Sequence, residues 1–155
     1  MDAVVLPDPI LPHIAINLYS ELIETKPNDL WYIFYLRGIS YEQSDNWQNA
    51  ELDFLQSLKI KRNSPNVLNY LAYGWIERDV KIHESFVMLT DAYNANPDSY
   101  YILDSLAWAY YKKKDYIKAA ELMEKVLDMV PGEAISLDHL GDIYFAMNRK
   151  REAMF

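Results

Sequence analysis

The strongest constraint on the fold is a repeat within the sequence. Residues 106–110 read LAWAY, and residues 140–144, which lie 34 positions later, read LGDIY. The same offset relates Pro97 to Pro131. A period of this length, with a small residue after leucine and a tyrosine three positions further on, is typical of helix-turn-helix arrays. The sequence therefore predicts an all-α fold in which helical hairpins stack on one another.

Prolines and short polar clusters divide the chain into segments. Pro27, Pro65, Pro97 and Pro131 are 38, 32 and 34 positions apart. Proline is tolerated in the first turn of a helix but not in its interior, so these positions mark helix boundaries. Asp115 is expected to cap the helix that follows it. The predicted helices cover residues 12–25, 29–43, 46–62, 65–78, 81–95, 98–113, 115–130 and 133–147, and a ninth is expected to begin near Arg149.

These helices predict a simple domain organisation. An extended N-terminal segment, residues 1–11, is expected to precede a single helical repeat domain, residues 12–155. The domain is expected to hold a lone helix at 12–28, repeats at about 29–64, 65–97 and 98–131, and an incomplete repeat at 132–155. The last repeat stops inside a hairpin, which favours a segment of a longer protein and leaves a complete chain as the alternative.

Composition excludes several classes of protein. A formal charge of −8 opposes binding to the phosphates of nucleic acids. The absence of cysteine excludes disulfides and thiolate sites. No apolar run approaches the roughly 20 residues that cross a bilayer, so direct membrane insertion is not expected. The first dozen residues lack the positive start of a secretory signal. A cytoplasmic location is expected if the chain is complete, whereas a periplasmic or membrane-associated location stays open if the chain was excised from a longer protein.

The pattern of reactive residues predicts no catalytic, cofactor or metal site. The four glycines are scattered, so no glycine-rich phosphate loop is present. His13 and His83 lie far from His139 and from each other, without metal-ligand spacing. His139 and Asp142 lie one turn apart on a predicted helix and are interpreted as a surface polar pair. The protein is therefore expected not to be an enzyme and to need no cofactor.

The repeated residues resemble the tetratricopeptide repeat (TPR), which favours Trp-x2-Leu-Gly-x2-Tyr in its first helix and Ala-x3-Phe, then Pro, in and after its second. The matching positions, which are expected to pack the repeats together, are Gly38, Tyr41, Ala50, Phe54, Leu71, Ala72, Trp75, Leu106, Ala107, Tyr110, Ala119, Leu140, Gly141, Tyr144 and Ala153. Arg37 departs from the pattern, which has leucine at that position. The match resembles the closing repeats of a longer bacterial TPR protein.

This resemblance implies a right-handed superhelical solenoid of antiparallel helix pairs, with about 3.5 to 4 repeats and eight or nine helices. The small residues Gly38, Ala72, Ala107 and Gly141 would then mark where two helix backbones approach closely. A larger side chain there is expected to overpack the crossing at a cost of roughly 1–3 kcal/mol.

The resemblance also implies a binding surface, because the first helices of TPR hairpins line a concave groove. The positions implied to face it are Tyr32, Tyr35, Asn66, Asn69, Tyr70, Tyr73, Tyr101, Asp104, Trp108, Tyr111, Asp138, Asp142 and Phe145. Apart from Asn66 and Asn69 these residues are aromatic or acidic, which predicts a protein or peptide ligand of apolar or basic character. For each tyrosine, packing against the adjacent hairpin is an equal alternative. A carboxylate-terminated chaperone tail is not expected, because no lysine or arginine is among these positions.

The predicted repeat array and groove suggest two alternative functions. The first is a non-enzymatic scaffold that holds an extended or helical segment of a partner protein in the groove. The alternative is a self-associating structural segment, a homodimer formed through an open end of the stack. The unfinished hairpin after Arg149 favours that alternative, since an uncovered apolar end promotes association.

Overall fold

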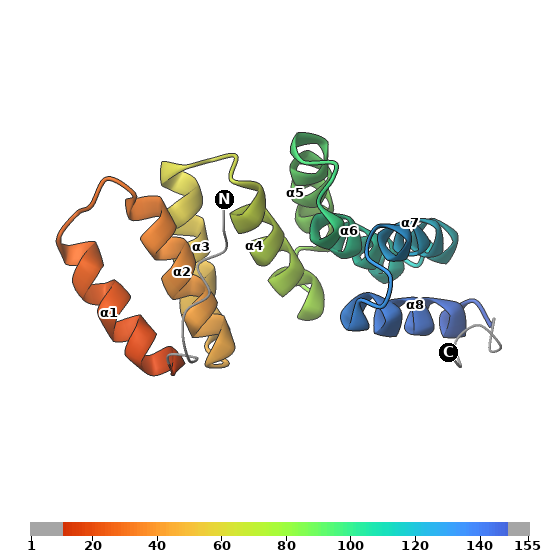
Figure 1. The fold of residues 1–155 in the computed structure, drawn as a ribbon, viewed down its shortest axis with the longest axis horizontal. Coiled ribbons are helices and arrows are strands. Elements are labelled where there is room, and N and C mark those ends of the chain that lie inside the picture. Colours follow the sequence, from red (N-terminus) through yellow and green to blue (C-terminus); the bar gives the residue numbers. More distant parts are fainter. Residues whose placement is uncertain (1–10, 149–155) are drawn as a thin grey trace. The chain divides into compact units, whose positions relative to one another are not determined.

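A computed structural model describes residues 11–148 of the chain as an array of α-helices (Figure 1). The helices are α1 (Pro12–Glu24), α2 (Leu30–Gln43), α3 (Trp47–Ile60), α4 (Pro65–Glu77), α5 (Ile82–Ala95), α6 (Tyr100–Lys112), α7 (Tyr116–Met129) and α8 (Ala134–Ala146). No strand occurs between residues 11 and 148. The predicted all-α fold is confirmed, and every predicted helix of this range ends within two residues of the observed bounds. The ninth helix and Ala153 lie outside the described residues.

Side-chain caps explain where several helices begin. Oδ1 of Asp115 accepts a hydrogen bond from the backbone N–H of Lys118 at 3.2 Å, which confirms the predicted cap of α7. Asn46 does the same for Asn49 at the start of α3. At α8 the capping side chain is Glu133, whose Oε2 accepts from the N–H of Ser136 at 2.7 Å. These bonds satisfy donors that the first turn of a helix would otherwise leave without partners.

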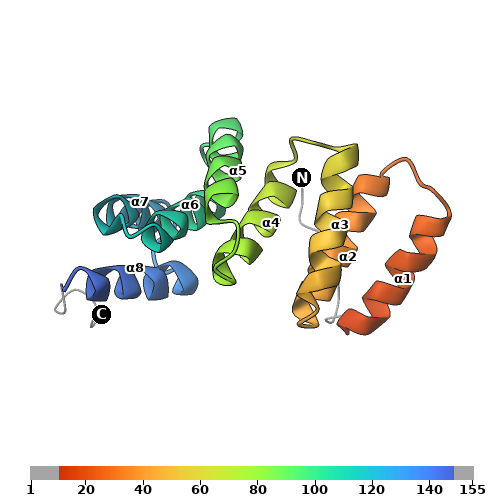
Figure 2. The ribbon, with the colours of Figure 1, turned by 180° about the vertical axis from the view of Figure 1, so that it is seen from behind.

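The helices form two compact units, one ending at Arg62 and the other beginning at Asn63. In the first unit, α2 packs against both α1 and α3 (Figures 1 and 2). In the second, each helix from α4 to α7 packs against the next, and α6 also contacts α4 and α8. The second unit therefore repeats one arrangement, in which the first helices of successive hairpins (α4, α6 and α8) lie next to one another. The predicted division into a single domain of repeats stays a prediction.

The positions that match the repeat pattern and lie within the described residues are all buried or half-buried. Those that are buried are Gly38, Ala50, Phe54, Leu71, Ala72, Trp75, Leu106, Ala107, Ala119 and Tyr144, and those that are half-buried are Tyr41, Tyr110, Leu140 and Gly141. In the second unit one continuous apolar cluster contains Ala72, Leu106, Ala107, Ala119 and Tyr144 together with Ile76, Leu89 and Met123, and Tyr110 and Leu140 pack against it. Small side chains at the crossings and large ones beside them let neighbouring helices approach without leaving voids.

Gly38 shows why a small residue is needed at a helix crossing. A Cβ atom at this position would lie 2.7 Å from Cε1 and 2.9 Å from Cδ1 of Phe54. Phe54 is fully buried, and its ring packs between Tyr35 and Trp47 at centroid distances of 6.4 and 6.2 Å. The ring therefore has little room to move away from an added methyl group.

We expect the substitution Gly38→Ala to destabilise the first unit by about 1–3 kcal/mol, because it overpacks the α2–α3 crossing. Native-state hydrogen exchange of the α2 and α3 amides measures this free energy directly. Ser40→Ala is a suitable control, since Ser40 lies in the same helix and donates only to the backbone carbonyl of Leu36. Equal exchange rates in G38A and the unsubstituted protein would show that the crossing tolerates a methyl group.

Candidate functional site

The second unit contains a hollow of about 300 Å³ on the side formed by α4 and α6. It is bounded at one end by the segment that leads into α8. The lining residues are Asn69, Tyr70, Tyr73, Tyr100, Tyr101, Asp104, Ser105, Glu133, Ile135 and Ser136. Helical periodicity explains the set, because residues three and four positions apart share one face of a helix. The hollow thus lies on the faces of first helices, where the repeat pattern predicts a binding surface.

Tyrosine rings form the rim of this hollow. Tyr70, Tyr100 and Tyr101 keep 37%, 36% and 38% of their surfaces exposed. Tyr100 and Tyr101 meet edge to face, with ring centroids 5.8 Å apart. The hydroxyl of Tyr101 donates to Oδ1 of Asn66 at 2.5 Å, which orients its ring. These rings are held in place, yet a ligand can still reach them.

A buried polar network forms the floor. Oδ1 of Asp104 accepts from the hydroxyl of Ser136 at 2.6 Å, and Oδ2 lies 2.9 Å from Nδ1 of His139. Nε2 of His139 in turn lies 3.5 Å from the hydroxyl of Tyr73. Asp104 and His139 are only 7% and 8% exposed. The network links α4, α6 and α8, and it orients the Asp104 carboxylate.

Two further groups in the hollow retain hydrogen-bonding capacity. Asn69 is 8% exposed, and its Oδ1 is buried without a hydrogen-bond partner among the described residues. Glu133 uses Oε2 to cap α8. Its other oxygen, Oε1, accepts no hydrogen bond that the structure shows within residues 11–148. The lining also contains no lysine, arginine or histidine. The hollow therefore offers acceptors and negative charge but no basic group.

Next to the hollow, aromatic rings stack across α6 and α8. The ring of Trp108 lies parallel to Tyr111 at 4.3 Å and to His139 at 4.1 Å, with interplanar angles of 12° and 16°. Nε1 of Trp108 donates to Oε1 of Glu77 in α4 at 2.7 Å. Burial raises the pKa of the Tyr111 hydroxyl, and the nearby Asp142 carboxylate raises it further, so this phenol stays protonated. Trp108 of α6 therefore contacts residues of both α4 and α8.

The structure brings five of the predicted groove residues to the hollow, namely Asn69, Tyr70, Tyr73, Tyr101 and Asp104. The remaining predicted residues of the second unit lie elsewhere. Asn66 contacts Tyr101, Trp108 and Tyr111 stack together, Asp138 and Asp142 are exposed, and Phe145 is 65% exposed. In the first unit, Tyr32 is 43% exposed and Tyr35 is buried. Whether any of them contacts a ligand stays a prediction.

Sequence reasoning missed several lining residues and misassigned one pair. Tyr100, Glu133, Ile135 and Ser136 line the hollow but come from helix starts, which the repeat pattern does not specify. The interpretation of His139 and Asp142 as a surface pair is wrong, because His139 is buried and bonds Asp104. Asp104 and His139 are 35 positions apart, close to the repeat period. The period itself was the signal that could have paired them.

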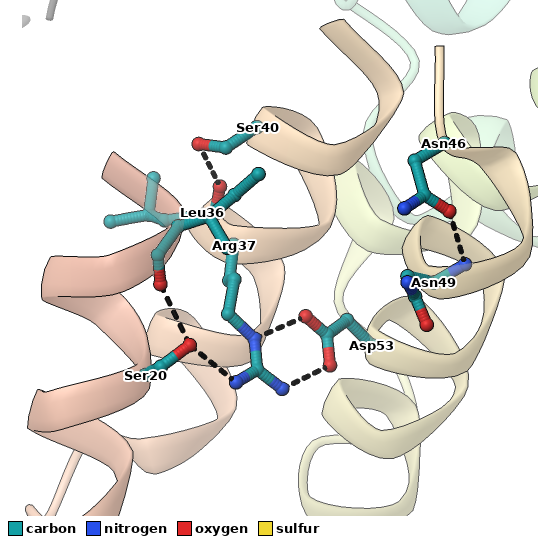
Figure 3. A network of polar contacts seen from close by, with 8 residues as sticks. Ser20, Leu36, Arg37, Ser40, Asn46, Asn49 and Asp53 are labelled. Carbon is teal, nitrogen blue, oxygen red and sulfur yellow. Dashed lines mark hydrogen bonds and ion pairs between the residues drawn. The ribbon is translucent and has the colours of Figure 1, made fainter. Parts of the chain in front are cut away.

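A second polar cluster occupies the first unit (Figure 3). Arg37 of α2 forms two parallel bonds to Asp53 of α3, from Nε at 2.6 Å and from the second terminal nitrogen at 2.7 Å. The remaining terminal nitrogen donates to the hydroxyl of Ser20 in α1 at 3.0 Å. The hydrogen bonds to Asp53 raise the pKa of the Arg37 guanidinium. Arg37 departs from the repeat pattern because it joins three helices through its charge.

A wider hollow of about 740 Å³ lies beside this cluster, lined by residues of α2 and α3 including Phe34, Leu52 and Lys59. Both oxygens of Asp53 and all three guanidinium nitrogens of Arg37 have partners within the unit. Arg37 therefore connects α1, α2 and α3 within the unit.

Neither metal binding nor membrane crossing has structural support in the part of the chain that the structure describes. Across residues 11–148, no three acidic or histidine side chains come together in a way that could hold a metal ion. None of the helices from α1 to α8 has the length and apolar character needed to cross a membrane.

Known proteins share this sequence pattern and this fold. A family model described as tetratricopeptide repeat matches residues 101–130. The TPR repeat-containing protein PA4667 of Pseudomonas aeruginosa is 26% identical over 123 residues, which cover 79% of this chain and 20% of that protein. The chain therefore spans about one fifth of the length of this relative.

Solved structures show the same fold. The solved chain of MamA from Desulfovibrio magneticus RS-1 that runs from position 41 to the end superposes with a TM-score of 0.78 at 22% identity, over 92% of this chain and 80% of that one. A tetratricopeptide repeat protein from Parabacteroides merdae has a TM-score of 0.78 at 15% identity, over 92% of this chain and 55% of that protein.

The paired helices, the repeat period and these likenesses define a helical repeat protein. One tetratricopeptide repeat is matched at residues 101–130, and the relative found by sequence is a protein of such repeats, which supports the resemblance seen in the sequence. A bacterial source fits the Pseudomonas relative. Arrays of this family are generally non-enzymatic scaffolds for interactions between proteins, and their extended concave surfaces are used for binding.

Proposed function

We propose that this chain is a non-enzymatic scaffold that holds a segment of a partner protein across the first helices of its second unit. The observation that carries the proposal is the hollow between α4 and α6, with ordered tyrosines at its rim and acceptors inside it. The partner segment would be extended or helical, and apolar or basic in character. Acidic ligands are disfavoured, because Asp104 and Glu133 line the hollow and no basic residue does.

The rim has the physical properties of a binding anchor. Three large rings remain more than a third exposed, although a soluble protein usually buries most of such surface. Tyrosine has few rotatable bonds, so a ligand gains a large contact area for a small loss of conformational entropy. Tyr100 and Tyr101 are already held by each other and by Asn66, which reduces that loss further.

The buried Asp104, His139 and Ser136 do not form a nucleophilic triad. In such a triad the histidine accepts a proton from the serine, and the aspartate orients the histidine. Here the hydroxyl of Ser136 donates to Asp104, and the other ring nitrogen of His139 faces Tyr73. The carboxylate therefore holds two neighbours in place without activating a nucleophile. This arrangement supports a structural role for the cluster and a scaffold function for the chain.

Selection from a random peptide library displayed on phage tests the proposal. We expect the full chain to select a set of related peptides, and the double variant Tyr70→Ala, Tyr101→Ala to bind them at least about tenfold more weakly, since each anchor is worth more than about 1 kcal/mol. Ile117→Ala is the matched control, because Ile117 is 76% exposed on α7, away from the hollow. Equal affinities of the double variant and the control would contradict the groove assignment. Circular dichroism establishes that both variants stay helical.

Self-association is the second candidate function, and exposed apolar residues on two helices favour it. Leu11, Ile14, Leu18 and Leu22 follow one face of α1 and are 56%, 44%, 48% and 44% exposed. On α8, Ile135, Leu137 and Phe145 are 59%, 44% and 65% exposed. We propose that α8 of one copy covers α1 of another, because this contact would bury both apolar surfaces.

Sedimentation velocity over a wide concentration range tests this second candidate. Association through α1 predicts a sedimentation coefficient that rises with concentration in the unsubstituted chain and stays at the monomer value in Leu18→Glu. Leu52→Glu is the control, because Leu52 is equally apolar and 60% exposed on α3. A monomer at every concentration would remove self-association and leave the scaffold proposal intact.

A further inference from the structure

We propose that the hollow between α4 and α6 is a pocket for one positively charged side chain, arginine or lysine, supplied by the partner segment. The inference deepens the proposed scaffold function and rests on it. It names the chemistry that the groove recognises at one position. Three independent features of the lining support it: an unsatisfied buried acceptor, two carboxylates with no lysine or arginine among the lining residues, and a set of aromatic faces.

The unsatisfied acceptor is Oδ1 of Asn69. This side chain is 8% exposed, lines the hollow, and has no hydrogen-bond partner for Oδ1 among the described residues. A buried acceptor without a donor is unfavourable in the free protein, and a bound donor group would remove that cost. Arginine and lysine carry only donors on their charged groups, so either one would satisfy this oxygen.

The negative charge comes from Asp104 and Glu133. No lysine, arginine or histidine lines the hollow to balance them. Each oxygen of Asp104 makes one hydrogen bond, to Ser136 or to His139, although a carboxylate oxygen can accept two. Oε1 of Glu133 has its full capacity for a ligand, while Oε2 holds the cap of α8. Because Asp104 is buried, its attraction for a cation is screened less than that of a surface carboxylate.

The aromatic faces belong to four tyrosines in the lining. A cation over an aromatic ring is attracted by the negative charge of the ring face, and guanidinium groups also stack on such rings. The molecule already uses this contact at other places: Lys61 lies 3.9 Å from the ring centre of Trp31, and Lys113 lies 4.1 Å from that of Phe86. Within residues 11–148, neither Tyr100 nor Tyr101 has such a cation of its own.

Small probes with matched neutral analogues test the charge requirement. We would titrate ¹⁵N-labelled full chain with N-acetyl-arginine methylamide and N-acetyl-citrulline methylamide, in which a neutral ureido group of nearly the same shape replaces the charged guanidinium. The second pair is N-acetyl-lysine methylamide and its Nε-acetylated form. We expect a charged probe to shift the side-chain amide signals of Asn69 and the backbone signals of Tyr101, and its neutral analogue to leave them in place. Equal shifts from charged and neutral probes, or no shift at Asn69 from any probe, would overturn the proposal.

Two variants test the groups that receive the cation. Glu133→Gln removes the charge but keeps a carbonyl oxygen that can cap Ser136, and we expect it to weaken binding of the charged probe about tenfold. Asp128→Asn is the matched control, because it removes the same charge from an exposed position on α7. Asn69→Leu removes the acceptor Oδ1, and we expect it to abolish the contribution of this oxygen to binding of the charged probe. The unfolding midpoint should not fall, because Oδ1 has no described partner that would lose a hydrogen bond. Unchanged affinity in both variants would overturn the proposal.

The phage-selected peptides separate this inference from the scaffold function. If the selected peptides contain an arginine or lysine whose replacement by citrulline or acetyl-lysine weakens binding to the α4–α6 face, both are supported. If they bind that face equally well with neutral residues, the cation pocket is wrong and the scaffold stands. If no peptide binds but the charged probe still shifts Asn69, the scaffold function is wrong and the hollow remains a cation site.

Discussion

Replacing Trp108 with alanine is expected to destabilise the second unit by about 3–5 kcal/mol. Trp108 is 7% exposed and stacks on both Tyr111 and His139. It also donates a hydrogen bond to Glu77, so the substitution removes contacts to α4 and α8 together. Native-state hydrogen exchange of the α6 amides measures the loss, because these amides exchange through opening of the unit.

A conservative change separates the stacking of Trp108 from its hydrogen bond. Trp108→Phe keeps an aromatic ring but leaves Glu77 without its donor, and we expect a smaller loss of about 1–2 kcal/mol. Ile117→Ala serves as the control, because a side chain that is 76% exposed contributes little packing. If W108A were as stable as the control, Trp108 would be a surface residue available to ligands, contrary to the structure.

Replacing Asp53 with alanine is expected to destabilise the first unit by about 3 kcal/mol. The side chains of Arg37 and Asp53 are 19% and 7% exposed and share two parallel hydrogen bonds. Removing the carboxylate leaves the guanidinium largely buried without its counter-charge, and this loss exceeds the value of an exposed ion pair. Hydrogen exchange of the α2 and α3 amides reports the change in this unit.

The double variant Arg37→Leu, Asp53→Leu tests the origin of that loss. Replacing a buried ion pair by apolar residues is often neutral, so we expect the double variant to be more stable than Asp53→Ala. Leucine is also the residue that the TPR pattern favours at the position of Arg37. Glu121→Ala, which breaks the exposed pair with Lys118 at 3.1 Å, should cost less than about 1 kcal/mol. A double variant as unstable as D53A would mean that the Arg37–Asp53 pair stabilises the first unit by more than the mutual neutralisation of two charges.

The helices and their packing positions could be predicted because they depend on local and periodic signals. Proline at 65 opens α4 as expected, and Asp115 caps α7. The small residues at 38, 72 and 107 are buried where helices cross. Each of these features follows from a single residue type at a defined place in the repeat.

The polar contacts between hairpins could not be predicted in the same way, because they join residues one or two repeats apart. Asp104 bonds Ser136 and His139, 32 and 35 positions away, and Tyr101 bonds Asn66 at an offset of 35. Equivalent helices lie side by side, so positions that match in the repeat become neighbours. Which neighbours form a bond depends on rotamers and burial, and these follow from packing rather than from the pattern.

Mapping a selected peptide onto the protein tests the central claim most directly. We would compare hydrogen exchange of the full chain with and without a saturating library-selected peptide. The account predicts slower exchange in α4, in α6 and at the start of α8, with α5 and α7 unchanged. Protection confined to α5 and α7 would contradict it, because the partner would then bind the second helices of the hairpins instead of the tyrosine-rimmed hollow.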